Sequence, residues 1–446
     1  MTVFYFLLAI SLLVVIHEYG HFWVARRCGV FVKRFSVGFG KPLWTFTDKH
    51  GTEFSIAPIP LGGYVSMLDE REAEVPAEQL HMAFNRKSPW QRIAIAAAGP
   101  AANFIFAIAA YWFLFLSGLS GLVPVVGDVQ QDSPAAIAGV QVSDEITAVN
   151  GKPTPTWEDV NWQLVSFLGE TTDIQLTLTS SDGAHYDVRV GVENWLAADE
   201  IPDPISALGL EPRRFKIPVT LAEVKAGGAA ERAGLQAKDT IVAANGQPVE
   251  SWSSWVELVK HSAEKTMQLT VVRDQQELIV SITPNSQTAE DGTVYGFVGA
   301  MVAIPEYPAD WVRKRQFGVI DAFGMSLQKT WETTYFTLAS FGKILAGQLS
   351  VKNLSGPVTI AKVAGATAAG GLESFVGFLA LLSVSLGVLN LLPVPVLDGG
   401  HIVFSLAEIV RGKPLSEQFQ MMAVKVGMFL LIGLMLVAFY NDLSRL

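Results

Sequence analysis

Four long apolar segments constrain the fold of this chain more than any other feature of its sequence. They lie at about 3–26, 93–116, 375–397 and 421–440, and each is close to the roughly 20 residues that an apolar helix needs to cross a bilayer. Only 17% of the 446 residues are charged, below the roughly 25% of a typical soluble domain. We therefore expect a polytopic α-helical membrane protein with four transmembrane helices in a lipid bilayer.

Basic residues predict the orientation of these segments. Lys and Arg gather in the loops 27–92 and 398–420, whereas the interval 117–374 has none before Lys152. Because cytoplasmic loops are enriched in basic residues, both loops are expected in the cytoplasm, with the interval and both termini outside. No basic region precedes the first segment and no small-residue cleavage site follows it, so it is expected to stay as a span.

Net charge and cysteine content narrow the possible partners of the protein and the ways in which its domains can be stabilised. The formal net charge of −10 argues against nucleic acid as a partner. Cys28 is the one cysteine, so no intramolecular disulfide can form. Any domain outside the membrane must then be stabilised by its own core.

The first apolar segment carries three ionisable side chains within His17-Glu18-Tyr19-Gly20-His21. Ionisable residues inside a membrane are candidates for a functional site. On a helix, His17 and His21 project from one face, a spacing that can hold one metal ion, and Glu18 is placed to act on a metal-activated water. The alternative is that polar residues simply face a bundle interior, but it must explain three ionisable groups together.

A third ligand is predicted at the end of the third apolar segment. Catalytic zinc usually has three protein ligands and an open position. Asp398 follows this segment, and the first and third segments run in the same direction, so His21 and Asp398 are expected in the same, cytoplasmic half. Pro393 and Pro395 must break the helix, and the residues just before Asp398 are expected to be extended.

Asp398 also has a plain structural interpretation. Asp is a favoured N-cap, so it could simply cap a helix over 400–410; the matching depth of the histidines favours the ligand. His401 is a weaker candidate for a metal ligand, because it is expected either beyond the metal or among the residues that surround the ligands. The other histidines follow no ligand pattern and are expected on the surface: His50, His81, His185 and His261.

The first cytoplasmic loop contains an unusually apolar stretch with β-type alternation, residues 53–68. Pro58 and Pro60 make it an edge strand if it is a strand, and Gly62-Gly63 is a turn signal. We expect a hairpin, either an ordinary cytoplasmic one or one that dips towards the membrane. At that depth its backbone must be shielded by protein or line a wet cavity.

An internal repeat occupies the interval between the second and third segments. Residues 133–157 realign on 227–252 with an offset of 95, which indicates a duplicated domain. Matched positions include Ala138-Gly139 with Ala233-Gly234, Asp144 with Asp239, Asn150-Gly151 with Asn245-Gly246, and Trp157 with Trp252. The copies resemble PDZ domains of the circularly permuted form found in bacterial proteases, which bind peptide ends by strand addition.

We name the copies the first module (122–212) and the second module (213–308). They could bind peptide ends, serve as a size filter over a membrane site, or only add bulk. The segment 309–371 has apolar residues at helix spacing and is predicted as a membrane-surface helix, interrupted at 352–359. The remaining parts are 1–121, with two spans and the hairpin, and 372–446, with the other two spans.

The motifs resemble those of the site-2 protease family of intramembrane zinc metalloproteases. The resemblance rests on His17-Glu18-x-x-His21, on Leu397-Asp398-Gly399, and on Gly99-Pro100-x-x-Asn103 in the second segment. Two tandem PDZ-like copies between the second and third segments are similar to the Gram-negative branch of the family that regulates the sigma-E stress response. The resemblance covers nearly the whole chain.

The resemblance implies a site and a substrate. Its implied zinc ligands are His17, His21 and Asp398, with Glu18 as general base. Substrate-strand positions are Gly62, Gly63, Tyr64, Asn390, Pro393 and Pro395, and accessory positions are Gly99, Pro100 and Asn103. The implied substrates are single-pass membrane proteins, such as an anti-sigma factor already trimmed on its outer side, with remnant signal peptides as a second implied class. The implied location is the bacterial inner membrane, with periplasmic modules and the active site towards the cytoplasm.

Two other function classes fit parts of the sequence. One is a non-catalytic PDZ scaffold whose intramembrane polar residues only join helices. The other is a metal-ion transporter, which needs a polar path on both sides of the site. The outer half of the first segment, residues 3–13, offers no such path.

Overall fold

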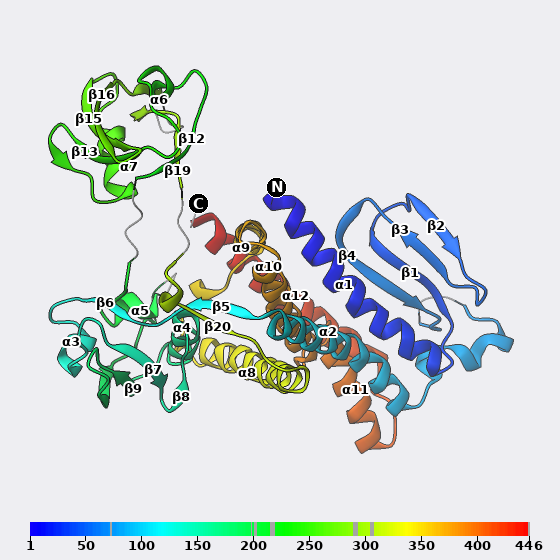
Figure 1. Ribbon diagram of the computed structural model, residues 1–446. Coiled ribbons are helices and arrows are strands. Elements are labelled where there is room, and N and C mark those ends of the chain that lie inside the picture. Colours follow the sequence, from blue (N-terminus) through cyan, green and yellow to red (C-terminus); the bar gives the residue numbers. More distant parts are fainter. Residues whose placement is uncertain are drawn as a thin grey trace.

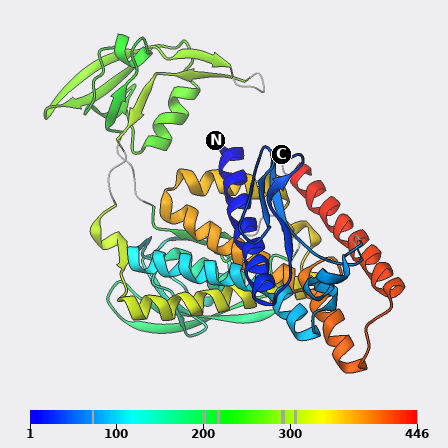
Figure 2. The same cartoon turned by 90° about the vertical axis from the view of Figure 1, so that its right-hand side faces the viewer.

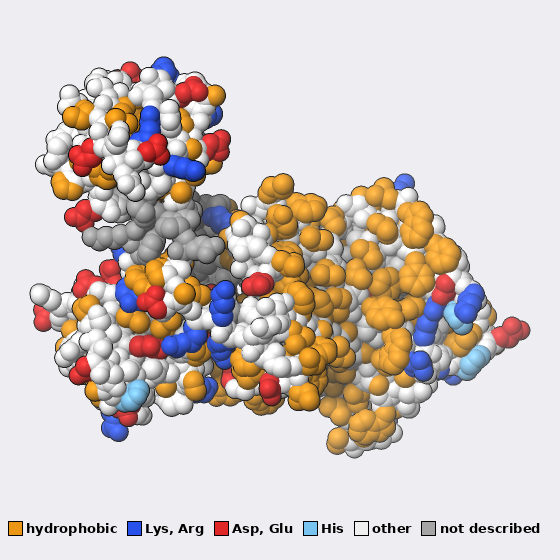
Figure 3. All heavy atoms as spheres, viewed as in Figure 1, with side chains coloured by type: hydrophobic (Ala, Val, Ile, Leu, Met, Phe, Trp, Pro, Cys, Tyr) orange, Lys and Arg blue, Asp and Glu red, His pale blue; other side chains and the backbone are white. Residues whose placement is uncertain are grey.

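The computed structural model of the chain describes residues 1–71, 74–197, 199, 203–214, 219–288, 293–303 and 307–444. Figure 1 shows a helical body, a sheet beside α1 at one end and two β-rich modules at the other. Hydrophobic side chains gather over the helical body, whereas charged side chains gather over the modules and the far end of the sheet (Figure 3). This distribution matches a body that lies in lipid with water-exposed parts at both ends.

Among the described residues, four helices are long and apolar enough to cross a membrane, as predicted. They are α1 (Thr2–Arg27), α2 (Pro89–Ser117), α10 (Leu372–Leu391) and α12 (Glu417–Ser444). The third helix ends at Leu391, six residues before its predicted end. Leu392 is extended (φ −61°, ψ 145°) because a residue before proline is disfavoured in the helical conformation, and Pro393 follows it.

Helix α2 lies at the centre of the helical body and packs against α1, α10 and two further helices, α8 (Val319–Leu345) and α11 (Asp398–Arg411). Small residues bring α1 and α2 close together. A Cβ atom on Gly20 would lie 2.2 Å from the carbonyl oxygen of Ala98, so the crossing requires glycine. Close backbone approach of this kind is typical of helix pairs in membranes.

Helix α12 is mostly exposed and is attached near its end. The Asn441 amide donates to the carbonyls of Val351 and Leu354. The Asp442 carboxylate accepts from the main-chain N–H groups of Val358 and Thr359, at the start of α9 (Pro357–Ala369). These bonds satisfy N–H groups that the first turn of a helix leaves free.

The sheet beside α1 has the strand order β2-β3-β1-β4. Its strands are β1 (Val32–Phe39), β2 (Trp44–Thr47), β3 (Glu53–Ile56) and β4 (Ile59–Met67). The prediction of an edge strand is correct for β4, but the predicted hairpin over 53–68 is wrong, since β3 and β4 flank β1 and do not pair with each other. Figure 2 shows the sheet in front of α1.

Gly62 and Gly63 lie inside β4 and not in a turn. A Cβ atom on Gly63 would lie 2.6 Å from the Ser36 carbonyl oxygen and 3.3 Å from Cγ1 of Val14. The glycines therefore allow β4 to pack closely against β1 and α1.

The two modules have the same strand order, β10-β9-β7-β8 in the first and β16-β15-β13-β14 in the second. The first contains β6 (Val126–Val129), α3 (Pro134–Ala138), β7 (Glu145–Val149), β8 (Lys152–Pro153), α4 (Trp157–Val165), β9 (Thr172–Thr179), β10 (His185–Val192), α5 (Pro204–Ala207) and β11 (Leu210–Pro212). The second contains β12 (Leu221–Val224), α6 (Ala229–Arg232), β13 (Thr240–Ala244), β14 (Gln247–Pro248), α7 (Trp252–Lys260), β15 (Met267–Arg273), β16 (Gln276–Ile282), β17 (Asn285–Thr288), β18 (Val294–Phe297) and β19 (Ala300–Val302).

Asn-Gly turns join the short hairpins of both modules. Asn150 and Gly151 have φ of 47° and 72°, and Asn245 and Gly246 have φ of 49° and 79°. Positive φ at both central residues is the signature of a type I′ turn, which favours Asn-Gly.

A two-stranded ladder connects the first module to α8. Strands β5 (Leu119–Leu122) and β20 (Val312–Arg315) pair antiparallel, between the end of α2 and the start of α8. Helix α8 buries Ala322 and Thr333, and leaves Ile320, Trp331 and Leu345 exposed at 86%, 71% and 88%. An apolar exposed face supports the prediction of a membrane-surface helix, which stays a prediction.

Candidate metal centre

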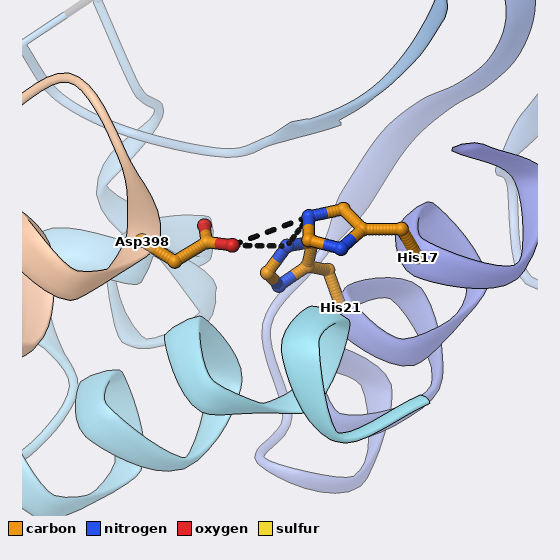
Figure 4. A group of neighbouring side chains, drawn as sticks. All are labelled: His17, His21 and Asp398. Atoms are coloured by element: carbon orange, nitrogen blue, oxygen red, sulfur yellow. Dashed lines mark hydrogen bonds and ion pairs between the residues drawn. The ribbon is translucent and has the colours of Figure 1, made fainter. Parts of the chain in front are cut away.

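Three side chains from the two ends of the chain meet inside the helical body (Figure 4). Oδ2 of Asp398 lies 3.2 Å from Nε2 of His17 and 3.4 Å from Nε2 of His21, and the two Nε2 atoms are 3.2 Å apart. Both histidines are 8% exposed. We call these three residues the ligand cluster.

The ligand cluster fits a zinc ion. Tetrahedral ligands at about 2.1 Å from zinc lie about 3.4 Å from one another. Oδ2 of Asp398 is buried and, among the described residues, has no hydrogen-bond partner, which is unfavourable for a carboxylate without a cation. Two imidazoles and one carboxylate also form a donor set typical of catalytic zinc.

Glu18 lies next to the cluster without belonging to it. One residue further along α1, its side chain turns about 100° away from His17. The main-chain N–H of Val65 in β4 points towards the Glu18 carboxylate, and a Cβ atom on Gly63 would lie 3.6 Å from Cγ of Glu18. The carboxylate is thus held between the ligand cluster and β4.

Helix α2 holds the outer nitrogens of both imidazoles. Nδ1 of His21 donates to the Ile95 carbonyl at 2.7 Å. A carbonyl can only accept, so Nδ1 carries the proton and Nε2 presents its lone pair to the cluster.

Asn103 has the corresponding position on His17. Its amide nitrogen lies 3.1 Å from Nδ1 of His17, and its Oδ1 is buried without a partner among the described residues. The nitrogen and oxygen of an amide are distinguished only by the hydrogen-bond network. Turning the amide over gives Oδ1 a donor and sets His17 in the same tautomer as His21.

Gly99 makes room for both rings. A Cβ atom on it would lie 2.3 Å from Nε2 of His21 and 2.8 Å from Cε1 of His17. Pro100 follows inside α2 and cannot donate a helical hydrogen bond to Ala96. The three accessory positions predicted in α2 therefore all lie at or next to the ligand cluster.

The structure decides against the N-cap alternative for Asp398 and corrects the expectation for the residues before it. Asp398 is not an N-cap, because Leu397 occupies that position and no side chain caps α11. Leu392 and Leu397 have extended backbone angles, but the residues before Asp398 do not continue as an extended strand. They form compact turns, in which Val394 N–H donates to the Leu392 carbonyl at 2.7 Å and Leu397 N–H donates to the Val394 carbonyl at 2.8 Å.

The glycines after Asp398 explain these turns. Cβ atoms on Gly399 and Gly400 would lie 2.2 Å from the Leu392 carbonyl oxygen and 2.5 Å from Cα of Pro395. The helix start is folded back onto the preceding turn, which only glycine allows. The Gly-Gly pair was the sequence signal for this turn.

The predicted substrate-strand residues lie on two segments that border the cluster. Gly62, Gly63 and Tyr64 belong to β4, beside Glu18. Asn390 is in the last turn of α10, and Pro393 and Pro395 are in the turns before Asp398. The other histidines are exposed, as expected: His50, His81, His185 and His261, with His401 also exposed and outside the cluster.

Comparison with known proteins places the chain in a family. The sequence model of peptidase family M50 matches residues 5–434. The chain is 46% identical over 442 residues to the regulator of sigma-E protease RseP of Escherichia coli (strain K12), covering 99% of this chain and 98% of that protein. It is 42% identical to a putative zinc metalloprotease of Vibrio cholerae, over 99% and 98% of the two chains, and 44% identical to one of Neisseria meningitidis, over 100% and 99%. The chain therefore belongs to peptidase family M50, the site-2 proteases, and is a membrane-embedded zinc metalloprotease.

Proposed function

We propose that this protease cleaves peptide bonds within the transmembrane segments of single-pass membrane proteins. The observation that carries the proposal is the ligand cluster, whose ligand atoms lie 3.2–3.4 Å apart and whose two histidines belong to α1, a helix apolar enough to span a membrane. His17, His21 and Asp398 would hold the zinc ion, and Glu18 would be the general base.

The chain's own groups have separate roles in this mechanism. Zinc, when bound, supplies Lewis acidity that activates water and the scissile carbonyl. The Glu18 carboxylate takes a proton from the attacking water and returns it to the leaving amide nitrogen. Ile95 and Asn103 keep both imidazoles in the ligand tautomer, and Val65 N–H faces the Glu18 carboxylate from β4.

An edge strand next to the site suits a substrate that must unwind. A transmembrane helix can be cut only when its freed N–H and C=O groups find new partners. Val65 N–H is directed at Glu18, so the edge of β4 that does not pair with β1 faces the cluster. We infer that the substrate adds there as a strand along Gly62, Gly63 and Tyr64. Asn390, Pro393 and Pro395 would contact it from the side of Asp398.

The modules are proposed as PDZ-like domains that filter substrates on the periplasmic side. Their shared strand order, short Ala-Gly helices and Asn-Gly turns support that fold. Basic residues at the other end of the body support a site towards the cytoplasm. The Escherichia coli relative is named a regulator of sigma-E protease, and this name fits our proposal of an anti-sigma factor-like substrate. We propose that this substrate is cut in the inner membrane during an envelope stress response. Remnant signal peptides form a second proposed substrate class.

The test of the catalytic proposal is Glu18→Gln in the full-length protein. Removal of a general base lowers the rate about 10²–10⁴-fold, while bound zinc stays because Glu18 is not in the cluster. Cleavage of a single-span reporter and zinc content are measured together, with Asp398→Ala as the variant expected to lose zinc. Full cleavage by Glu18→Gln would contradict the proposal.

The filter is tested by removing both modules. Leu122 and Val312 are directly paired, so residues 123–311 can be replaced by Asn-Gly with the β5–β20 ladder kept. We expect this protein to cut substrates whose outer part has not been trimmed, which the full-length protein refuses. Unchanged selectivity would count against the filter, and a loss of cleavage of trimmed substrates would show that the modules do more than filter.

A further inference from the structure

One turn of α2 contacts both elements that carry the ligand cluster. The Ile95 carbonyl accepts from His21 of α1, and Arg92, one turn earlier, forms an ion pair with Glu408 of α11 at 2.5 Å. Asp398 is the first residue of α11. Figure 1 shows α2 between α1 and α11. A helix that supplies no ligand thus ties together the two helices that do.

The Arg92–Glu408 pair is largely shielded from water. The two side chains are 16% and 19% exposed, and Nε of Arg92 is buried without a hydrogen-bond partner among the described residues. Exposed ion pairs contribute little, but removing one partner of a shielded pair leaves a charge without compensation. This pair is therefore a specific connection across 316 residues of sequence.

Arg92 and Glu408 each lie at a helix end where the helix dipole disfavours their charge. Arg92 lies near the first turn of α2, which begins at Pro89, and Glu408 lies in the last turn of α11, which ends at Arg411. Helix dipoles favour the reverse arrangement, acids at the start and bases at the end. Neither residue stabilises its own helix by charge, so their contribution comes from joining α2 to α11.

Asp398 depends on the direction of α11. Its Oδ2 contacts the two histidines of the ligand cluster and has no hydrogen-bond partner among the described residues, so no side chain outside the cluster fixes it and its position follows the backbone of α11. The start of α11 is folded onto a turn at Gly399 and Gly400, and Glu408 lies about 15 Å further along, at 1.5 Å per residue. Without the tie at Arg92, α11 can pivot about that turn and move Asp398 away from the histidines.

We propose that the Arg92–Glu408 ion pair is a positioning device that holds Asp398 at zinc-binding distance from His17 and His21. The inference rests on the proposed zinc site and extends it to two residues that do not touch the metal. Their effect on zinc passes through the orientation of α11.

The experiment measures zinc affinity of the purified full-length protein by competition with a chromophoric chelator. Glu408→Gln keeps the length and polarity of the side chain and should weaken zinc binding about tenfold, as other residues that orient ligands do. Arg411→Gln, an exposed charge on the same helix, is the matched control and should bind zinc as the wild type does. The exchanged pair Arg92→Glu with Glu408→Arg should restore most of the affinity, and its charges also suit both helix dipoles.

Hydrogen exchange of the zinc-free proteins gives a second readout. Residues 398–402 should exchange faster in Glu408→Gln than in the wild type, and the exchanged pair should reverse this. Unchanged affinity in Glu408→Gln, or a folded exchanged pair that does not recover it, would overturn the positioning role. Asp398→Ala distinguishes a failure of the proposed zinc site from a failure of the positioning role. If Asp398→Ala keeps zinc, the proposed zinc site is wrong. If Asp398→Ala loses zinc and Glu408→Gln does not, only the positioning role is wrong.

Discussion

The two modules bury the same aspartate against different partners. Asp144 and Asp239 are 2% and 0% exposed and occupy equivalent positions in the repeat. Asp144 accepts from the Tyr186 hydroxyl at 2.5 Å, whereas Asp239 accepts from Nε and Nη2 of Arg273, both at 2.7 Å. The first module thus satisfies its buried acid with a neutral hydroxyl, and the second with a cation.

Their attachment to the helical body differs as well. Nζ of Lys343 in α8 donates to the carbonyls of Ser166 and Leu168 and to the Glu170 carboxylate in the first module. Apart from the exposed Arg214–Glu211 pair at the boundary of the two modules, the described ion pairs of the second module lie inside it. The second module stands away from the body (Figure 1, Figure 2). The same kind of fold is therefore part of the membrane-bound body in one copy and separate from it in the other.

The largest difference between the modules is expected from Arg273→Met. It leaves Asp239 buried without its cation and should destabilise the second module by about 3 kcal/mol. Hydrogen exchange should accelerate in β13 and β15, with β7 and β9 unchanged. Lys260→Met, which breaks an exposed pair with Glu257, should change stability by less than about 0.5 kcal/mol. Equal acceleration in both modules would contradict independent stability of the two copies.

A smaller effect is expected from Tyr186→Phe in the first module. It removes one hydrogen bond to Asp144 and should destabilise that module by about 1.5 kcal/mol. The Gln141 N–H still donates to the carboxylate at 2.7 Å, so the acid keeps a partner. Hydrogen exchange in β7 and β9 is the measurement. A loss of stability as large as that caused by Arg273→Met would argue against a difference between the hydroxyl partner of Asp144 and the cationic partner of Asp239.

The attachment of the first module is tested by Lys343→Met. Its partly exposed ion pair and hydrogen bonds should contribute about 1 kcal/mol. We expect faster exchange in α4 and the end of α8, with the second module unaffected. A change confined to the second module would reverse our view of which copy is fixed.

The smallest effects are expected from pH. Burial opposes ionisation of Asp239, but hydrogen bonds from Arg273 hold its pKa below the ordinary value. The ionised carboxylate therefore stabilises the second module above about pH 4, and this stabilisation is lost as the pH falls further. Burial and the hydrogen bond to Asp144 raise the pKa of Tyr186 to about 12. The protonated hydroxyl therefore stabilises the first module below about pH 10, and this stabilisation is lost as the pH rises towards the pKa of Tyr186. Exchange, corrected for the intrinsic rate, should loosen the second module first in acid and the first module first in base. The opposite order would contradict the distinction between the neutral partner of Asp144 and the cationic partner of Asp239.

Much of the architecture was predictable because its signals are local. Apolar length identified the four long helices, and the i, i+4 spacing of His17 and His21 put both imidazoles on one face. Predictions failed where glycine and proline had more than one use. Gly62-Gly63 looked like a turn but permits close strand packing, and Pro393 and Pro395 produce turns where extended chain was expected.

The sequence by itself determined the spans, the ligand types and their spacing along one helix, because hydrophobicity and helical periodicity act over a few residues. Only the tertiary structure decided which groups surround them. Asn103 and Ile95 on the imidazoles, Arg92 on Glu408, and the different partners of Asp144 and Asp239 all join residues distant in sequence. Such pairs depend on how helices and strands pack, and no local pattern in the chain records that packing.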